Sequence, residues 1–185
     1  MPRAGLDAEA VVAAAAALAD KDGLSELTLA RLAGALGIRT PSLYAHVDGL
    51  GDLRARLGAR AAQEMASALQ AAAAGRSGVD ALRAVAGAYR AYAHAHPGTY
   101  AAGQVASDRE ENQAAGAAVV GVLAAVLSGY GLDGDRAIHA IRAVRSALHG
   151  FVSLEREGGF GLPLSLDESF VTLVDMIDAG LQRTA

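Results

Sequence analysis

The sequence contains no cysteine and no tryptophan, and aromatic residues make up only 4% of its 185 residues. Without cysteine, the chain cannot form a disulfide, a zinc ribbon or an iron–sulfur cluster, and it has no thiol nucleophile. Lysine is almost absent as well, since Lys21 is the single lysine among sixteen basic residues. Twenty acidic residues bring the formal net charge to −4. That charge argues against a protein that coats nucleic acid through bulk electrostatics.

Alanine, in contrast, is abundant and fills about a quarter of the chain, and it is the strongest helix former. Apolar residues recur at helical spacing, with no strand-like alternation and no repeat of fixed period. Glycine, proline and aspartate separate the helical segments. We therefore predict an all-α protein of about nine helices. The predicted helices are 7–21, 28–36, 40–46, 50–74, 79–94, 98–105, 107–130, 135–157 and 166–183.

One uncharged stretch, 112–132, is about long enough to span a membrane. Much of it is alanine and glycine, it contains polar side chains, and no basic cluster flanks it. We therefore predict a helix buried inside an all-α domain, not a membrane span. Asp7 and Glu9 follow closely on the N-terminus, where a secretory signal would carry an uncharged apolar core, so we expect a cytoplasmic protein.

The segment 28–47 has the pattern of a helix-turn-helix. Gly37 can adopt the left-handed conformation that turns the chain between two short helices. Ala33 lies four residues earlier, where close contact of the helices requires a small side chain. The apolar positions of the shared core are Leu32, Leu36, Ile38, Leu43 and Val47. An ordinary helical hairpin is the alternative.

In a helix-turn-helix, the second helix enters the major groove of DNA with its N-terminal half. Here that helix is 40–46, and its polar residues suit the task. Arginine can reach a phosphate or a guanine edge, hydroxyls can donate hydrogen bonds, and proline and threonine can touch thymine methyls. The predicted DNA-contacting residues are Thr28, Arg39, Thr40, Pro41, Ser42, Tyr44 and His46.

The net charge of this N-terminal region is negative, which is not typical of a DNA-binding head. Residues 1–48 hold four cations, Arg3 among them, and six anions. A DNA-binding head is normally basic. Asp20, Asp22 and Glu26 cluster near the end of the first helix, and we expect them to face away from DNA. We predict few ion pairs with phosphate and a shallow dependence of binding on salt.

The first fifty residues or so resemble the DNA-binding head of the TetR family of transcriptional regulators. The resemblance rests on the helix 7–21 and on the runs 27–33, 36–38 and 43–47. Val47 stands where the family usually has phenylalanine. The family often has a lysine shortly after this point as a phosphate contact. This chain has none there, so we expect Arg54 or Arg56 to replace it.

The remainder is similar to a TetR subgroup named for a Trp-His-Gly motif in its C-terminal domain. The supporting runs are 89–100, 148–155 and 158–163. Leu148 stands directly before His149 and Gly150, so the tryptophan has no counterpart here.

The resemblance implies a DNA-binding head over 1–49, a connecting helix over 50–77 and a ligand-binding and dimerisation domain over 78–185. It also implies a homodimer that binds a palindromic double-stranded DNA operator, with the last two helices forming the dimer interface. An ordinary core position is the alternative for each residue of that interface. The expected interface residues are Ile141, Leu148, Phe170, Leu173, Ile177 and Leu181.

A pocket for a small, mostly apolar effector is expected among the central helices, where a few polar groups could orient it. Each candidate could equally be a core or surface residue. His139 and Arg142 lie one helical turn apart and could form a ligand clamp, a surface pair or part of the dimer interface. The candidate pocket residues are Tyr89, Tyr92, His96, Tyr100, Gln104, His139, Arg142 and His149.

Catalytic and metal motifs are not evident. His94 and His96 lie close together, but no second pair of ligands completes a zinc site on a helix. The glycine-rich run 158–161 follows no predicted strand and lacks the residues of a phosphate-binding loop. We predict no enzymatic activity, no metal and no cofactor. The function predicted is a ligand-responsive regulator, by family default a repressor, in which a ligand shifts the helix 50–74. The alternative is a helical dimeric adaptor that has lost specific DNA binding.

Overall fold

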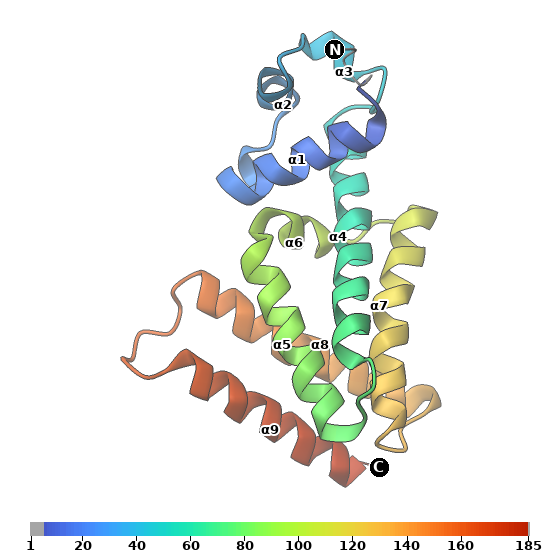
Figure 1. Ribbon diagram of the computed structural model, residues 1–185, viewed down its shortest axis with the longest axis vertical. Helices are drawn as coiled ribbons and strands as arrows, with labels where there is room; N and C mark the ends of the chain where they lie inside the picture. The colour runs from blue at the N-terminus through green and yellow to red at the C-terminus, as the bar shows by residue number, and fades with distance from the viewer. Residues whose placement is uncertain (1–5, 185) are drawn as a thin grey trace. The chain divides into compact units, whose positions relative to one another are not determined.

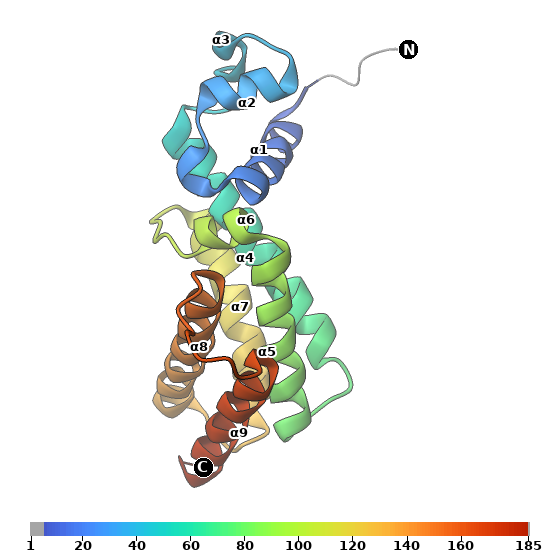
Figure 2. The same cartoon turned by 90° about the vertical axis from the view of Figure 1, so that its left-hand side faces the viewer.

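The computed structural model describes residues 6–184, so Arg3 and the rest of 1–5 lie outside the described residues. The described chain is all α-helical, as predicted, with one short 3-10 helix, η1 (Figures 1 and 2). The elements are α1 (Ala8–Asp22), η1 (Leu24–Glu26), α2 (Leu29–Leu36), α3 (Thr40–Leu43), α4 (Leu50–Ala73), α5 (Gly78–Ala95), α6 (Pro97–Gly103), α7 (Glu110–Ser128), α8 (Gly134–Arg156) and α9 (Leu166–Thr184).

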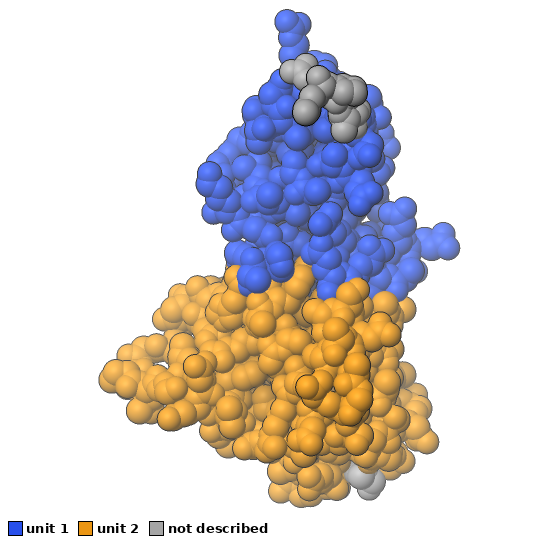
Figure 3. Space-filling view, viewed as in Figure 1, with its two compact units in different colours: residues 1–64, 95–116 blue, residues 65–94, 117–185 orange. Residues whose placement is uncertain are grey.

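The chain divides into two compact units (Figure 3). Unit 1 comprises residues 1–64 and 95–116, and unit 2 comprises residues 65–94 and 117–185. Unit 1 therefore contains α6 and the start of α7 in addition to the helix-turn-helix. This structural division differs from the expected functional boundaries at 49 and 77, which stay a prediction.

Local signals in the sequence account for the ends of the first helices. The side chain of Asp7 accepts a hydrogen bond from the Ala10 amide at 2.7 Å and caps α1. Thr28 caps α2 in the same way, since its hydroxyl oxygen accepts from the Arg31 amide at 3.2 Å. Gly37 ends α2 with φ +67°, in the left-handed region that favours glycine.

The core of unit 1 is built by α1, α2, α3 and the first part of α4. Its largest fully buried side chains are Val11, Leu27, Leu32, Leu43, Val47, Leu53 and Leu57. Five of these come from the segment 27–53, so the short helices α2 and α3 depend on packing with α1 and α4 for their stability.

Helix α6 lies against α1 at a very close approach. A Cβ atom placed on Gly98 would be 2.1 Å from the carbonyl oxygen of Ala19, so only glycine fits there. Two polar contacts of the Asp20 side chain add to this packing. It accepts a hydrogen bond from the Thr99 amide at 2.6 Å and lies 3.3 Å from Nδ1 of His96. These contacts fix α6 within unit 1.

Unit 2 contains an ion-pair cluster that joins α5, α8 and α9. The guanidinium of Arg90 donates to Glu155 from Nε at 2.9 Å and to Asp167 at 2.7 Å, and lies over the Phe170 ring. His94 also contacts Glu155, at 2.7 Å. The hydrogen bonds from Arg90, aided by His94 and opposed by burial, lower the pKa of Glu155 to about 2.

Helix α7 corrects one expectation. We expected the uncharged stretch to be a buried helix, but only 22% of its most apolar window is buried. The expectation was wrong because many of the uncharged side chains are alanine or glycine, which offer little apolar area to bury in a core. Buried positions include Ala115, Leu123, Val126 and Leu127. By length and composition the helix could cross a membrane, which is weak evidence on its own.

We predict that Gly98→Ala destabilises the protein by about 3 kcal/mol, because the new methyl group collides with the α1 backbone. The matched control is Gly87→Ala in α5, where an added Cβ meets nothing within 4 Å. That change should stabilise the chain by up to about 1 kcal/mol, since alanine favours helix over glycine. Urea unfolding of both variants measures the difference. Equal stabilities would contradict the close approach of α6 to α1.

We predict that Glu155→Gln lowers the free energy of unfolding by about 2 kcal/mol at neutral pH. The native pKa of about 2 lies below the ordinary value of 4.5, so the carboxylate stabilises the fold above pH 4.5 and loses this effect as the pH falls toward 2. Stability curves of wild type and variant should therefore converge in that range. Asp167→Asn, at an exposed partner of the same arginine, is the control and should change stability much less. Parallel curves down to pH 2 would refute the ion pair.

Candidate functional site

The candidate site centres on α3, which is a single turn of helix. It is shorter than the predicted 40–46, but the chain continues in hydrogen-bonded turns, with the amides of His46 and Val47 both donating to the Leu43 carbonyl at 2.9 and 3.0 Å. Leu43 and Val47 point into the core, with exposed fractions of 0% and 2%. Pro41 lies in the first turn, where its missing N–H leaves no bond unmade.

Burial of those two side chains leaves a polar face in solvent. Tyr44 is 59% exposed. Arg39, Pro41 and Ser42 are also exposed, whereas Thr40 and His46 are half-buried. The structure therefore brings the predicted residues 39–46 together on one short exposed segment. Thr28 is exposed at the start of α2, where its hydroxyl oxygen is used as the helix cap.

The charges around this segment are unevenly distributed. Arg31 is bound by two carboxylates, Asp22 at 2.7 Å and Glu26 at 2.9 Å. Arg39 has no carboxylate within ion-pair distance among the described residues. Residues 27–47 contain no acidic side chain at all. Asp22 and Glu26 are thus engaged by Arg31, and the guanidinium in this segment that has no carboxylate partner is that of Arg39.

A buried carboxylate holds the start of α4. Asp52 is 5% exposed and accepts hydrogen bonds from the Asp48 amide and from Nε of Arg56, both at 3.0 Å, and from Arg109. Burial alone would raise the pKa of Asp52, but these hydrogen bonds, led by Arg109, lower it below its usual value. Asp52 was not among our predicted site residues. Its position in the first turn of a helix after Asp48 and Gly49 was the available signal.

The two candidates for a replacement phosphate contact are both directed elsewhere. Arg56 is held by Asp52. Arg54 donates to the Leu24 carbonyl at 3.5 Å. Neither arginine lies free beside α3 in the way that Arg39 does.

In unit 2, an apolar groove of about 690 Å³ runs between α8 and α9. Its walls are mainly small side chains, with His139 and Arg136 contributing polar groups. The apolar lining includes Ala140, Ala143, Ala147, Ile177, Gly180 and Leu181. Small side chains allow another helix to approach closely, so this groove is shaped to receive a helix.

The expected dimer residues divide into two groups. Ile141, Leu148, Phe170 and Leu181 are at most 7% exposed within a single chain, so they mainly form the core of their own unit. Leu173 and Ile177 are half-buried. Helical periodicity identifies the buried stripe but does not distinguish burial by the same chain from burial by a partner.

The eight candidate pocket residues are distributed over both units. His96, Tyr100 and Gln104 belong to unit 1, and the other five belong to unit 2. Tyr89, Tyr92 and Tyr100 are buried, Gln104 donates to the Tyr100 carbonyl at 3.4 Å, and His139 lines the groove beside α9. Arg142 is exposed and His149 half-buried.

No cluster of three or more histidine, aspartate or glutamate side chains suited to hold a metal occurs within residues 6–184. Several carboxylates of the described residues instead join separate segments through hydrogen bonds and ion pairs, as Asp20, Asp52 and Glu155 do.

The chain is similar to known proteins over most of its length. Residues 82–177 match the family described as "Tetracyclin repressor-like, C-terminal domain". The chain is 41% identical over 183 residues to an uncharacterized HTH-type transcriptional regulator, Rv0681 of Mycobacterium tuberculosis, covering 97% of this chain and 84% of that protein. It is 33% identical over 160 residues to a second uncharacterized HTH-type transcriptional regulator, YobS of Bacillus subtilis, covering 86% of this chain and 84% of that protein.

Among solved structures, a TetR variant from Acinetobacter baumannii AYE in complex with minocycline superposes with a TM-score of 0.73 at 25% identity. The superposition covers 97% of this chain and 98% of that one. These similarities do not extend to the Trp-His-Gly subgroup, which stays a prediction.

Proposed function

Because the chain belongs to the TetR family of helix-turn-helix transcriptional regulators, we propose that it binds a palindromic DNA operator as a homodimer and responds to a small, mostly apolar ligand. The observation that carries the DNA-binding part is the segment 39–46, an exposed polar turn anchored by the buried Leu43 and Val47. By family default the regulator is a repressor.

The proposed contacts follow from the chemistry of the exposed groups. Arg39 binds a phosphate or a guanine edge, and the hydroxyls of Thr40 and Ser42 donate to bases or phosphates. Pro41 touches a thymine methyl. The phenol of Tyr44 donates to phosphate, and His46 and the Thr28 hydroxyl do the same from the flanks of the segment.

The acidic net charge of the head is compatible with this role. Asp22 and Glu26 are engaged by Arg31, and Asp52 by Arg56 and Arg109. These carboxylates act inside unit 1, and the segment 27–47 that would meet DNA carries no acid. Few cations remain free for phosphate, so we expect a shallow salt dependence.

The groove between α8 and α9 is the proposed dimer face. It is apolar, lined by small side chains and open to solvent. If a two-fold axis passes through this groove, the same helix of each protomer packs into the groove of the other protomer. Ile177 and Leu181 line this groove and Leu173 lies one turn before Ile177 on α9, whereas Ile141, Leu148 and Phe170 stay in the protomer core.

The proposed response to a ligand rests on membership of the family and on the continuity of helix α4. The neighbour from Acinetobacter baumannii is in complex with minocycline, a small molecule. Helix α4 runs unbroken from unit 1 into unit 2, and Asp52 fixes its first turn to the head. A ligand among the central helices that shifts α4 would therefore move the head. The shift in DNA affinity can be no larger than the ligand's preference for one state over the other.

We expect the regulator to act in the cytoplasm, where its DNA lies, and we expect no enzymatic activity. The runner-up function, a dimeric adaptor without specific DNA binding, is an outcome of the following test.

The test is binding of the purified protein to DNA from beside its own gene and to random DNA, at two salt concentrations. Selective binding is expected, and Arg39→Ala should weaken it by about tenfold and reduce the salt slope by about one ion. Arg31→Ala is the matched control, because its guanidinium is already neutralised by Asp22 and Glu26. Circular dichroism checks that both variants fold. Equal, weak binding of all proteins to both DNAs would favour the adaptor.

A second prediction concerns the dimer. Ala143→Glu places a charge in the α8–α9 groove and should dissociate the dimer, since an unpaired buried carboxylate is costly. Ala118→Glu on the exposed side of α7 is the control and should leave the dimer intact. Light scattering after size-exclusion chromatography reports the mass of each variant. An undiminished dimer with Ala143→Glu would move the interface elsewhere.

A further inference from the structure

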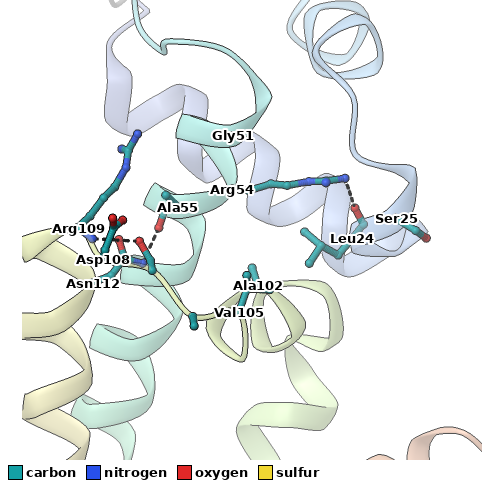
Figure 4. Close-up of a pocket in the computed structure, with 12 residues that line it drawn as sticks. Leu24, Ser25, Gly51, Arg54, Ala55, Ala102, Val105, Asp108, Arg109 and Asn112 are labelled. Atoms are coloured by element: carbon teal, nitrogen blue, oxygen red, sulfur yellow. Dashed lines mark hydrogen bonds between the residues drawn. The ribbon is translucent and has the colours of Figure 1, made fainter.

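A second hollow lies wholly within unit 1, at the base of the helix-turn-helix (Figure 4). Its volume is about 550 Å³, within the range of small-molecule sites. It is bounded by η1, by the first turns of α4 and by the segment from α6 to the start of α7. None of the residues expected to line the effector pocket belongs to its wall, so it is a different site.

The wall of the hollow is largely apolar. Leu24 comes from η1, Ala55 from α4, Ala102 from α6, and Val105 and Ala106 from the connection to α7. Val105 is 67% exposed, so its side chain is open to contact with a ligand. An apolar ligand chain would cover such side chains and remove them from water.

One cation of this wall has no carboxylate partner in the described part of the chain. Figure 4 shows the Arg54 side chain extending from α4 toward Leu24, whose carbonyl it contacts at 3.5 Å. That distance is at the outer limit of a hydrogen bond. No carboxylate of the described residues lies within ion-pair distance of Arg54, whereas Arg109 on the same wall is held by Asp52. Arg54 is therefore available to an anion.

A polar atom of the wall also lacks a partner. Asn112 donates from Nδ2 to the Ala55 carbonyl at 2.9 Å, which sets the orientation of its amide. Its Oδ1 is buried and has no hydrogen-bond donor. This oxygen is buried, and an ionised carboxylate has no proton to donate to it, so Asn112 takes no part in selecting an anion.

We propose that this hollow binds a small amphipathic monocarboxylate. The carboxylate pairs with Arg54, and the hydrocarbon part lies along Leu24, Ala55 and Val105. A single negative charge matches the single free guanidinium. Asp108 on the same wall disfavours a doubly charged ligand such as a phosphate monoester.

Occupancy would have a regulatory consequence, and this step rests on the proposed function. The ligand would join η1 of the helix-turn-helix to α4 and to the segment before α7. It would thereby favour one placement of the head and alter the affinity for the operator. The effector expected among the central helices would act on a later part of α4. The effects of the two ligands on DNA binding can therefore be measured separately.

Calorimetric titration without DNA tests the binding step. The probes are octanoate and its neutral analogue octanamide. Octanoate should bind wild type about tenfold more tightly than octanamide, and Arg54→Gln should remove that preference. Arg76→Gln is the matched control, because Arg76 is another arginine of the α4 region whose described contacts are backbone carbonyls. It should bind octanoate as wild type does. Equal losses in both variants, or equal binding of both probes, would overturn the proposal.

A second variant blocks the hollow by size. Ala106→Phe, at an exposed position of the wall, should abolish octanoate binding without unfolding the protein. Octanoate binding that survives this change would overturn the assigned location. Operator binding is measured on the same samples with and without octanoate. Loss of DNA binding in all samples would count against the proposed function, whereas the calorimetric result would still decide the ligand site.

Discussion

The burial of Leu43 and Val47 is the constraint on which the proposed interface depends. Helix α3 is one turn long, and a helix of that length has no stability of its own. Its position is set by two apolar side chains that enter a core formed by α1, α2 and α4. Since these two side chains point inward, the polar residues between and around them must point outward. The exposed segment 39–46 is thus a consequence of core packing, and its chemistry is what makes it suited to DNA.

Acidic residues of unit 1 form hydrogen bonds and ion pairs within the unit. Asp20 joins α1 to α6, Asp22 and Glu26 hold Arg31, and Asp52 joins the start of α4 to the segment before α7. Three of the six acidic residues in 1–48, namely Asp20, Asp22 and Glu26, are therefore engaged in contacts within unit 1. Net charge alone would have argued against DNA binding, whereas the contacts of these three carboxylates weaken that objection.

Local features were predictable from the sequence because their causes are local. The turn at Gly37 and the caps at Asp7 and Thr28 follow from residue type and short spacing. The expectation for α7 failed because an uncharged stretch rich in alanine and glycine offers little apolar area to bury. Contacts such as Arg109 with Asp52 join residues 57 positions apart, and no short-range pattern reveals them. The periodic apolar stripe on α8 and α9 predicted that these side chains are buried. It could not show whether the same chain or a dimer partner buries them.

The absence of cysteine makes the central claim directly measurable. A single Ser42→Cys substitution on α3 gives a unique site for a tethered iron chelate that cleaves nearby DNA. We expect two clusters of cleavage in the bound DNA, related by two-fold symmetry and facing the major groove of each half-site. A chelate on Ser128→Cys, exposed on α7, should give no such pattern. Diffuse cleavage from Ser42, or the same weak pattern from both positions, would contradict the assignment of 39–46 as the segment that reads DNA.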